Sequence, residues 1–407
     1  MSLVRVSVAT PMRGEAAQSG ALADFIPMDE GGSGKEGVII PVGGGDPGEV
    51  QVDPGRYLVR AYLPSGTVLS RQIEVGAEAT DLIFESGTPH EWLAWQNLVQ
   101  RRAPVASDST PTRVDPIMHF VESGAQPSWE ALHALVRFRS RPSTHDLVAA
   151  LRAAPSNPQG DRFVDDRTES FVFAPQADAP LGRLRYAIVE RGPTVDVASV
   201  ALPWLCFVRG GIEAARIDLA MPRSAEGHVA LAVQDPQLGA LLGFIGSGRL
   251  PAAKTMTVRP GTALRDSLLA AVYGKLENPF AAAAGAYVLL QSDPSPQAEW
   301  HSWIENLAQW FPWFPDGAVL HGTLRMRQAK SSADIAAARE AFELAAARGI
   351  PVFAPIFRLL LDGVSTLVDD PDVDAGDLPQ KLPHIRGVAT VLSPDLAFTN
   401  LHFGGNQ

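Results

Sequence analysis

The spacing of apolar residues changes along the chain, from every second residue at the front to helical spacing at the back, and this change constrains the fold most. In residues 1–87 apolar and polar side chains alternate, so that Val4, Val6 and Val8 share one face. Such alternation is typical of half-buried strands. Residues 261–370 instead carry apolar runs at helical spacing, joined by short connections with proline or glycine. The sequence therefore predicts β structure first and helices last.

The turns between the first strands carry proline and glycine. Asp53–Pro54–Gly55 suits a turn, because proline presets φ and glycine accepts a positive φ. The segment 52–59 resembles the small carboxypeptidase-regulatory-like and PEGA-type β-sandwiches, in which a Pro-Gly turn leads into a strand with an inward tyrosine, here Tyr57. The resemblance implies a β-sandwich module over residues 1–87 that scaffolds or binds and has no catalytic residues.

Two further parts are predicted behind this module. Residues 88–160 form a helical linker region, with exposed linkers at 103–116 and 155–167 that are rich in proline and polar residues. Residues 161–258 contain short apolar runs at regular spacing with turns between them, which predicts a second antiparallel β domain.

Residues 259–407 are predicted to form an α-helical domain that ends in an acidic loop and tail. Gly285–Ala286–Tyr287 and Gly317–Ala318–Val319 recur at about the length of a tetratricopeptide (TPR) or Sel1-type repeat, so the helical hairpins are TPR/Sel1-like in length. The expected helices are 263–276, 280–290, 297–311, 316–328, 333–348 and 352–367. The predicted fold class is thus a multidomain α+β protein.

The composition of the chain argues against several classes of function. The net charge of −11 works against binding to nucleic acid, which depends on neutralising phosphates. No window reaches the roughly 18 apolar residues of a membrane span. The single cysteine, Cys206, excludes an internal disulfide framework and is typical of a reducing compartment. We expect a cytoplasmic protein that binds neither nucleic acid nor membrane.

Three segments carry part of a known motif and fail its requirements. Residues 31–37 suggest a phosphate loop, but Asp29 and Glu36 stand where glycine and Ser/Thr are needed. Residues 245–249 lack the outer glycines of a nucleophile elbow. Residues 370–377 lack the sixth-position glycine of a calcium loop. The sequence therefore predicts no catalytic residues, no metal site and no cofactor.

Tryptophan gives the densest signal in the chain. Six tryptophans are candidates for partner binding: Trp92, Trp95, Trp300, Trp303, Trp310 and Trp313. Their spacing allows two interpretations. They form a packed core between helices, or they form a partly exposed anchor for a protein partner, since tryptophan is enriched in binding hot spots.

Two local patterns support a resemblance to a protein class. The first is the run 88–96, which contains Trp92 and Trp95; the second extends from Asn278 to Ala318. Together they resemble uncharacterised bacterial proteins associated with caspase-like or trypsin-like peptidases in defence systems. The resemblance implies an adaptor, regulator or substrate of such a peptidase. Cys206 lacks the local signature of a caspase-like active site, so the chain is not expected to be the protease.

The leading hypothesis is a non-catalytic protein-interaction protein, whose partner and oligomeric state the sequence leaves open. One alternative is a hydrolase with an unrecognised active site in the middle β domain. A pocket that unites His228 or Cys206 with carboxylates would favour it. Another alternative is a structural or assembly protein of a phage-like particle, which predicts symmetric self-association.

Overall fold

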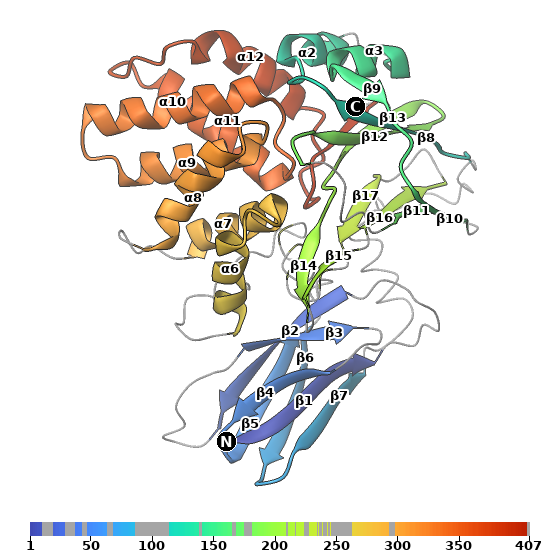
Figure 1. The fold of residues 1–407 in the computed structure, drawn as a ribbon, viewed down its shortest axis with the longest axis vertical. Helices are drawn as coiled ribbons and strands as arrows, with labels where there is room; N and C mark the ends of the chain where they lie inside the picture. Colours follow the sequence, from blue (N-terminus) through green and yellow to red (C-terminus); the bar gives the residue numbers. More distant parts are fainter. Residues whose placement is uncertain are drawn as a thin grey trace, which may run out of the picture.

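The computed structural model shows a chain with a β domain at one end and a larger body of sheets and helices at the other (Figure 1). The structure describes residues 1–9, 19–28, 37–42, 47–62, 68–85, 114–137, 141–164, 168–174, 181–208, 211–215, 217–223, 228–233, 235, 238, 242, 245, 263–292 and 298–404. Trp92, Trp95 and the segment 29–36 lie outside the described residues.

The N-terminal domain is built from strands alone. Within the described residues its strands are β1 (Ser2–Ala9), β2 (Ser19–Pro27), β3 (Gly37–Val42), β4 (Gly48–Val52), β5 (Gly55–Tyr62), β6 (Val68–Val75) and β7 (Thr80–Glu85). Their order is β4-β1-β3-β2-β5-β6, with β7 beside β1. β1 meets β3 at one residue pair, Val8 and Val42, so the sheet folds back on itself there.

This fold-back encloses a small core, as the alternating pattern predicts. Val4 and Val6 of β1 are fully buried, and so is Val59 of β5 from the other half of the sheet. Tyr57 points inward, its ring 6.2 Å from that of Phe25, and its hydroxyl donates to the Asp53 carbonyl at 2.8 Å. The predicted N-terminal β-sandwich is confirmed.

The larger body contains two main antiparallel sheets and a hairpin. Its strands are β8 (Ile117–Ser123), β9 (Ala153–Pro155), β10 (Gly160–Val164), β11 (Thr168–Phe173), β12 (Arg185–Arg191), β13 (Thr194–Val200), β14 (Leu205–Val208), β15 (Gly211–Ala214), β16 (Ile217–Pro222), β17 (Ala230–Val233) and β18 (Asn400–Phe403). The central sheet has the order β18-β13-β12-β8-β9, the second has β10-β11-β16-β17, and β14 pairs with β15. The predicted antiparallel β region is confirmed, and β8, β9 and β18 join it from outside the predicted range 161–258.

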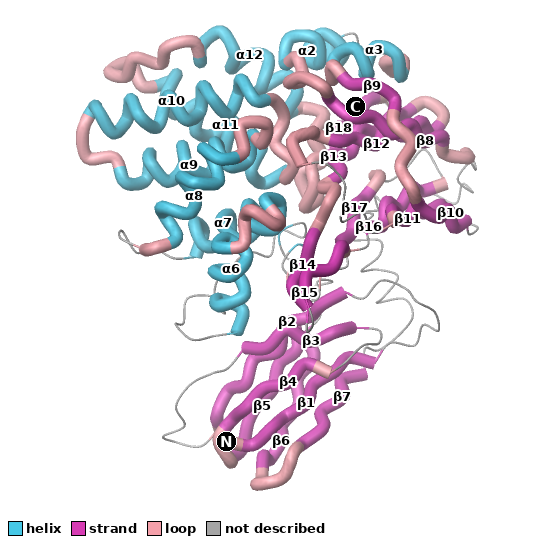
Figure 2. The backbone as a smooth tube through the Cα atoms, viewed as in Figure 1, coloured by secondary structure: helices cyan, strands magenta, loops and turns pink. Residues whose placement is uncertain are grey.

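The central sheet lies between the second sheet and the helices, as Figure 2 shows. Phe120 of β8 faces the second sheet, where its ring lies 5.5 Å from that of Phe173. Tyr186 of β12 pairs with Val121, the next residue of β8, and therefore points to the opposite face. On that face Tyr186 interacts electrostatically with the Asp316 carboxylate at the start of a helix. Burial raises the pKa of the Tyr186 phenol, and the negative charge of Asp316 raises it further. Tyr186 therefore stays protonated in the core.

The helices are α2 (Trp129–Arg137), α3 (Thr144–Ala150), α6 (Ala263–Tyr273), α7 (Pro279–Ser292), α8 (Trp300–Trp310), α9 (Pro315–Gln328), α10 (Ser332–Arg348), α11 (Ala354–Asp369) and α12 (Leu378–Ala389). The six helices expected in the C-terminal part are present as α6 to α11. The predicted tail, in contrast, contains α12 and β18. Helix α12 was not predicted, because Pro379 and Pro383 argue against a helix there. Pro379 nevertheless lies in the first helical turn, where proline is well tolerated.

One continuous core joins the sheets to the helices. It extends from Phe120 to Phe403 and is separate from the core of the N-terminal domain. The fold class, a multidomain α+β protein, is confirmed. The domain boundaries at 87, 160 and 258 stay predictions. Within the described part of the chain, no helix is both long and apolar enough to cross a bilayer.

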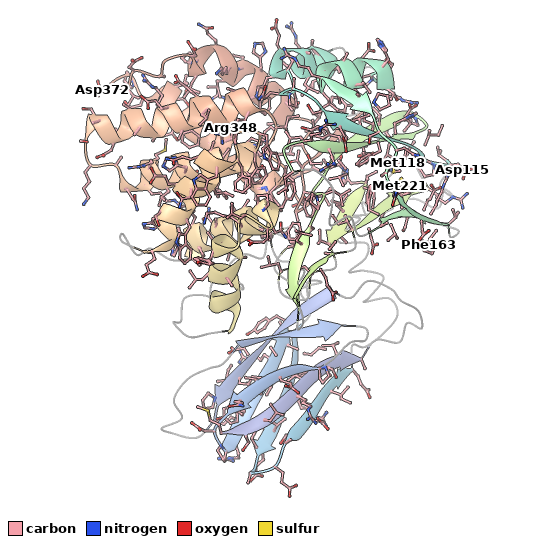
Figure 3. The ribbon with its side chains drawn as sticks, viewed as in Figure 1. Asp115, Met118, Phe163, Met221, Arg348 and Asp372 are labelled. Carbon is pink, nitrogen blue, oxygen red and sulfur yellow. The ribbon has the colours of Figure 1, made fainter. Side chains whose placement is uncertain are left out.

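Part of the predicted second linker is a strand. Residues 160–164 form β10, which pairs with β11 along its full length. All five residues are exposed, because β10 is an edge strand, and Phe163 lies at the outer edge of the sheet (Figure 3). The polar composition that predicted a linker therefore reflects exposure of an edge strand.

A buried carboxylate ties two of the helices together. Asp316, in the first turn of α9, is fully buried and accepts backbone N–H groups from Val352 at 2.8 Å and Phe353 at 3.1 Å. Phe353 is the N-cap residue of α11, which has no side-chain cap of its own. Asp316 therefore caps α11 from a neighbouring helix.

We predict that Asp316→Asn changes how stability depends on pH. Burial raises the pKa of the Asp316 carboxyl to about 7, above its ordinary value of 3.8. The folded state then holds this proton more tightly than the unfolded chain, so the stabilisation is present below about pH 4 and is lost as the pH rises toward 7. The free energy of unfolding of the wild type, minus that of the variant, should fall by up to about 1.4 kcal/mol per pH unit in this window. Denaturant titrations of both proteins measure it; a constant difference would contradict the assignment.

Phe342 of α10 is inserted between two glycines of neighbouring helices. Its ring is fully buried. A Cβ atom at Gly322 of α9 would lie 3.1 Å from the ring, and one at Gly363 of α11 would collide with it. The two glycines therefore let α9, α10 and α11 approach closely.

Gly363→Ala is expected to lower the free energy of unfolding by about 1–3 kcal/mol through overpacking. Gly124→Ala is the matched control, because a Cβ there has no atom within 4 Å. Combining Gly363→Ala with Phe342→Leu should cost less than the sum of the single changes, since the smaller side chain relieves the collision. Thermal or chemical denaturation provides the values; strict additivity would refute the contact.

Candidate partner-binding site

A cavity of about 630 Å³ opens where the end of α6 meets β14 and α8. We call it the α6–α8 cavity. Its lining residues are Leu205, Asp235, Leu238, Ala270, Ala271, Tyr273, Gly274, Lys275, Leu276, Glu277, Asn278, Ala281 and Trp310. Most of this surface is apolar, with a few charged or amide groups, which is the usual composition of a ligand pocket.

The turn between α6 and α7 is held in place by Asn278. Its side-chain oxygen accepts the backbone N–H of Ala281 at 2.9 Å, so it caps the start of α7, where Pro279 follows. Its amide nitrogen donates to the Leu205 carbonyl of β14. The two contacts fix the turn, and with it the residues 274–277 that line the cavity.

Lys275 brings a positive charge into this apolar surface. The residue is 4% exposed, and its Nζ lies 5.1 Å from the ring centre of Trp310 and 6.0 Å from that of Tyr273. Among the described residues, its ammonium makes no hydrogen bond and no ion pair. Contact with aromatic faces stabilises a cation only in part. Burial accordingly lowers the pKa of Lys275, although the nearby Glu277 charge opposes this.

Three large apolar side chains around the cavity are exposed to solvent. Tyr273 is 71% exposed, Leu276 59% and Trp310 50%. Trp303, about two turns before Trp310 on the same face of α8, supports Tyr273 through an edge-to-face ring contact at 5.5 Å. A contiguous apolar patch with a polar centre is typical of a binding surface.

A second charged group, Asp235, also lines the cavity. Asp235 is 3% exposed, and its two carboxylate oxygens accept the indole N–H of Trp204 and the backbone N–H of Leu238, each at 2.8 Å. These contacts hold the carboxylate in place. The cavity can therefore accept a bulky apolar group, with Lys275 available for an acceptor such as a carboxylate.

The tryptophans singled out by the sequence have different environments. Trp310 lines the cavity, and Trp303 lies half-buried beside it. Trp300 is in the core at 2% exposure, and Trp313 is half-buried against the Phe280 ring at 5.8 Å. Partner binding by these four, and by Trp92 and Trp95, stays a prediction. The sequence did not single out Lys275 or Tyr273, because only the turn at Asn278 brings them to α8.

The hydrolase alternative rests on His228 or Cys206. The side chain of Cys206 lies outside the described residues. His228 Nδ1 lies 3.2 Å from Ser393 Oγ, and burial lowers the pKa of the imidazole, although the Asp196 carboxylate opposes this. Ser393 is only 3% exposed, so its hydroxyl is a poor nucleophile for a large substrate. The pair thus provides the contact but not the access that a serine hydrolase needs.

Comparison with protein families relates the C-terminal part of the chain to a described domain. The model of a family described as the Y4kD C-terminal domain matches residues 240–400, which include α6 to α12. The match therefore contains the turn 274–277 and Trp310. No curated protein and no solved structure matches the chain.

We predict that the cavity binds an environment-sensitive apolar dye. Trp310→Ala removes one wall of the cavity and one of the two aromatic rings near Lys275, so dye fluorescence should fall several-fold. Leu344→Ala is the matched control, because Leu344 is 45% exposed on α10 and does not line the cavity. Fluorescence titration of the wild type and both variants measures the effect. Equal binding by all three proteins would show that the cavity is not accessible.

Proposed function

We propose that the chain is a non-catalytic protein-interaction protein that acts as an adaptor, regulator or proteolytic target, and that a partner docks at the α6–α8 cavity. The observation that carries this proposal is the exposure of Tyr273, Leu276 and Trp310 around a cavity that contains the buried Lys275. Aromatic side chains at a concave surface are enriched in binding hot spots.

The residues that line the cavity indicate which kind of partner segment would bind there. The apolar walls favour a bulky aliphatic or aromatic side chain. Lys275 is desolvated and lacks a described ion-pair partner, so an incoming carboxylate would restore the interactions that its ammonium loses on burial. We therefore propose a partner segment with an apolar anchor next to a carboxylate.

The partner proposed is a caspase-like peptidase of a bacterial defence system, and the place of action is the cytoplasm. The support for the peptidase is the resemblance carried by residues 88–96 and by the stretch from Asn278 to Ala318. That stretch starts at the turn that shapes the cavity and includes Trp303 and Trp310. The support for the cytoplasm is the single cysteine.

The proposal is tested by affinity capture with the full chain from extracts of the native host, followed by mass spectrometry. Three baits are compared with the wild type: the double variant Lys275→Met with Trp310→Ala, the double variant Trp92→Ala with Trp95→Ala, and the control Leu344→Ala. We expect one partner to lose at least tenfold in enrichment with the cavity variant, which corresponds to about 1.4 kcal/mol. The control should keep it.

The identity of that partner decides the finer proposal. A caspase-like peptidase that binds the chain or cleaves it supports the adaptor, regulator or target role. Partners that are captured equally by the wild type and the cavity variant would contradict docking at the α6–α8 cavity. A partner that is lost only with the Trp92 and Trp95 changes would move the binding site to residues 88–96.

A further inference from the structure

Three potential metal ligands meet between the two sheets of the larger body, far from one another in sequence. Asp196 lies on β13, His402 lies directly opposite it on β18, and His228 lies just before β17. One ligand atom from each residue can be chosen so that all three lie within 4.8 Å of one another. We call these three residues the β18 cluster.

The cluster has short internal contacts. Nδ1 of His402 lies 3.0 Å from Oδ1 of Asp196. The rings of His228 and His402 are 5.2 Å apart at an angle of 84°. Asp196 is fully buried, whereas the side chain of His402 is 24% exposed, which leaves the cluster a route to solvent.

Neighbouring residues orient the ligands. Arg191, also fully buried, donates to Oδ2 of Asp196 and so leaves Oδ1 directed at the histidines. Ser393 Oγ lies 3.2 Å from Nδ1 of His228, which fixes that ring and leaves Nε2 free for a ligand. Outer hydrogen bonds of this kind hold the carboxylate and imidazole ligands of metal sites in place.

An unsatisfied oxygen lies beside the cluster. Asn400, on the same face of β18 as His402, donates its amide to Oδ1 of Asp196 at 3.3 Å and to the Val229 carbonyl at 2.7 Å. Its own side-chain oxygen is buried and has no hydrogen-bond partner among the described residues. A buried acceptor without a donor is destabilising, and a bound cation or the water on it would satisfy that acceptor.

We propose that Asp196, His228 and His402 bind a divalent transition metal ion, with zinc as the first candidate. Two imidazoles and one carboxylate favour zinc and its neighbours over magnesium or calcium, which prefer oxygen ligands alone. In a tetrahedral site, ligand atoms at zinc bond lengths lie roughly 3.3 Å apart. The three ligand atoms here lie within 4.8 Å of one another, so small side-chain movements bring them to the distances that zinc needs. The Arg191 guanidinium repels a cation, so the site is weaker than one with thiolate ligands.

The test uses the full chain after removal of metal with a chelator. Equilibrium dialysis against zinc, with elemental analysis, should give one tightly held equivalent. Cobalt(II) in its place should give the visible absorption of a four-coordinate site. His228→Gln and His402→Gln should each reduce bound metal at least tenfold, whereas His145→Ala should not, because His145 is 93% exposed and remote in sequence from the cluster.

The thermal unfolding midpoint supplies a second readout. Zinc should raise it for the wild type and for His145→Ala, and a chelator should reverse the rise. If the glutamine variants fail to fold, the wild-type stoichiometry and cobalt spectrum decide alone. Absence of a bound equivalent in the wild type would overturn the proposal, as would equal binding by the two folded glutamine variants.

Discussion

The pairing of β18 with β13 is the constraint on which the rest of the larger body depends. It brings the last described strand of the chain back to the edge of the central sheet, beside the strand β13, which lies far earlier in the sequence (Figure 1). The segment before it is fixed as well, because Thr399 donates to the Val352 carbonyl at 2.8 Å and accepts from Ser199 at the same distance. Helices and sheets therefore share one core, and neither layer buries its apolar face without the other.

Both sites follow from this closed arrangement. The β18 cluster exists only because β18 places His402 opposite Asp196 and Asn400 beside them. The α6–α8 cavity lies at the border between the helices and the hairpin strand β14, where Asn278 connects the two. The two sites use different residues and are separate in chemistry, one buried and rich in nitrogen ligands, the other open and aromatic.

Local structure was largely predictable from the sequence. The alternation around Val4 and Val59 and the helical spacing from Ala263 onward reflect local periodicity, and the structure reproduces both. The strand β18 was missed because it has only four residues and follows a proline-containing stretch, so its stability comes from its partner β13. Helix α12 was missed because its prolines outweigh its apolar spacing when packing is unknown.

The candidate sites were less accessible to sequence analysis. Trp303 and Trp310 stood out by spacing, but Lys275 is unremarkable until the turn at Asn278 brings it under the aromatic rings. Asp196, His228 and His402 form no motif, because metal-ligand spacing is recognisable only when ligands lie on one or two elements. Residues so far apart in sequence come together through the pairing of distant strands, and a local sequence pattern does not reveal that contact.

Native-state hydrogen exchange of the backbone amides tests the central claim, that β18 closes a single cooperative core, most directly. The account predicts that the amides of residues 400–403 which donate to β13 exchange with the same opening free energy as those of 195–198 and of α11. Much faster exchange of 400–403, with β13 and α11 still protected, would show that β18 opens alone and would contradict the account.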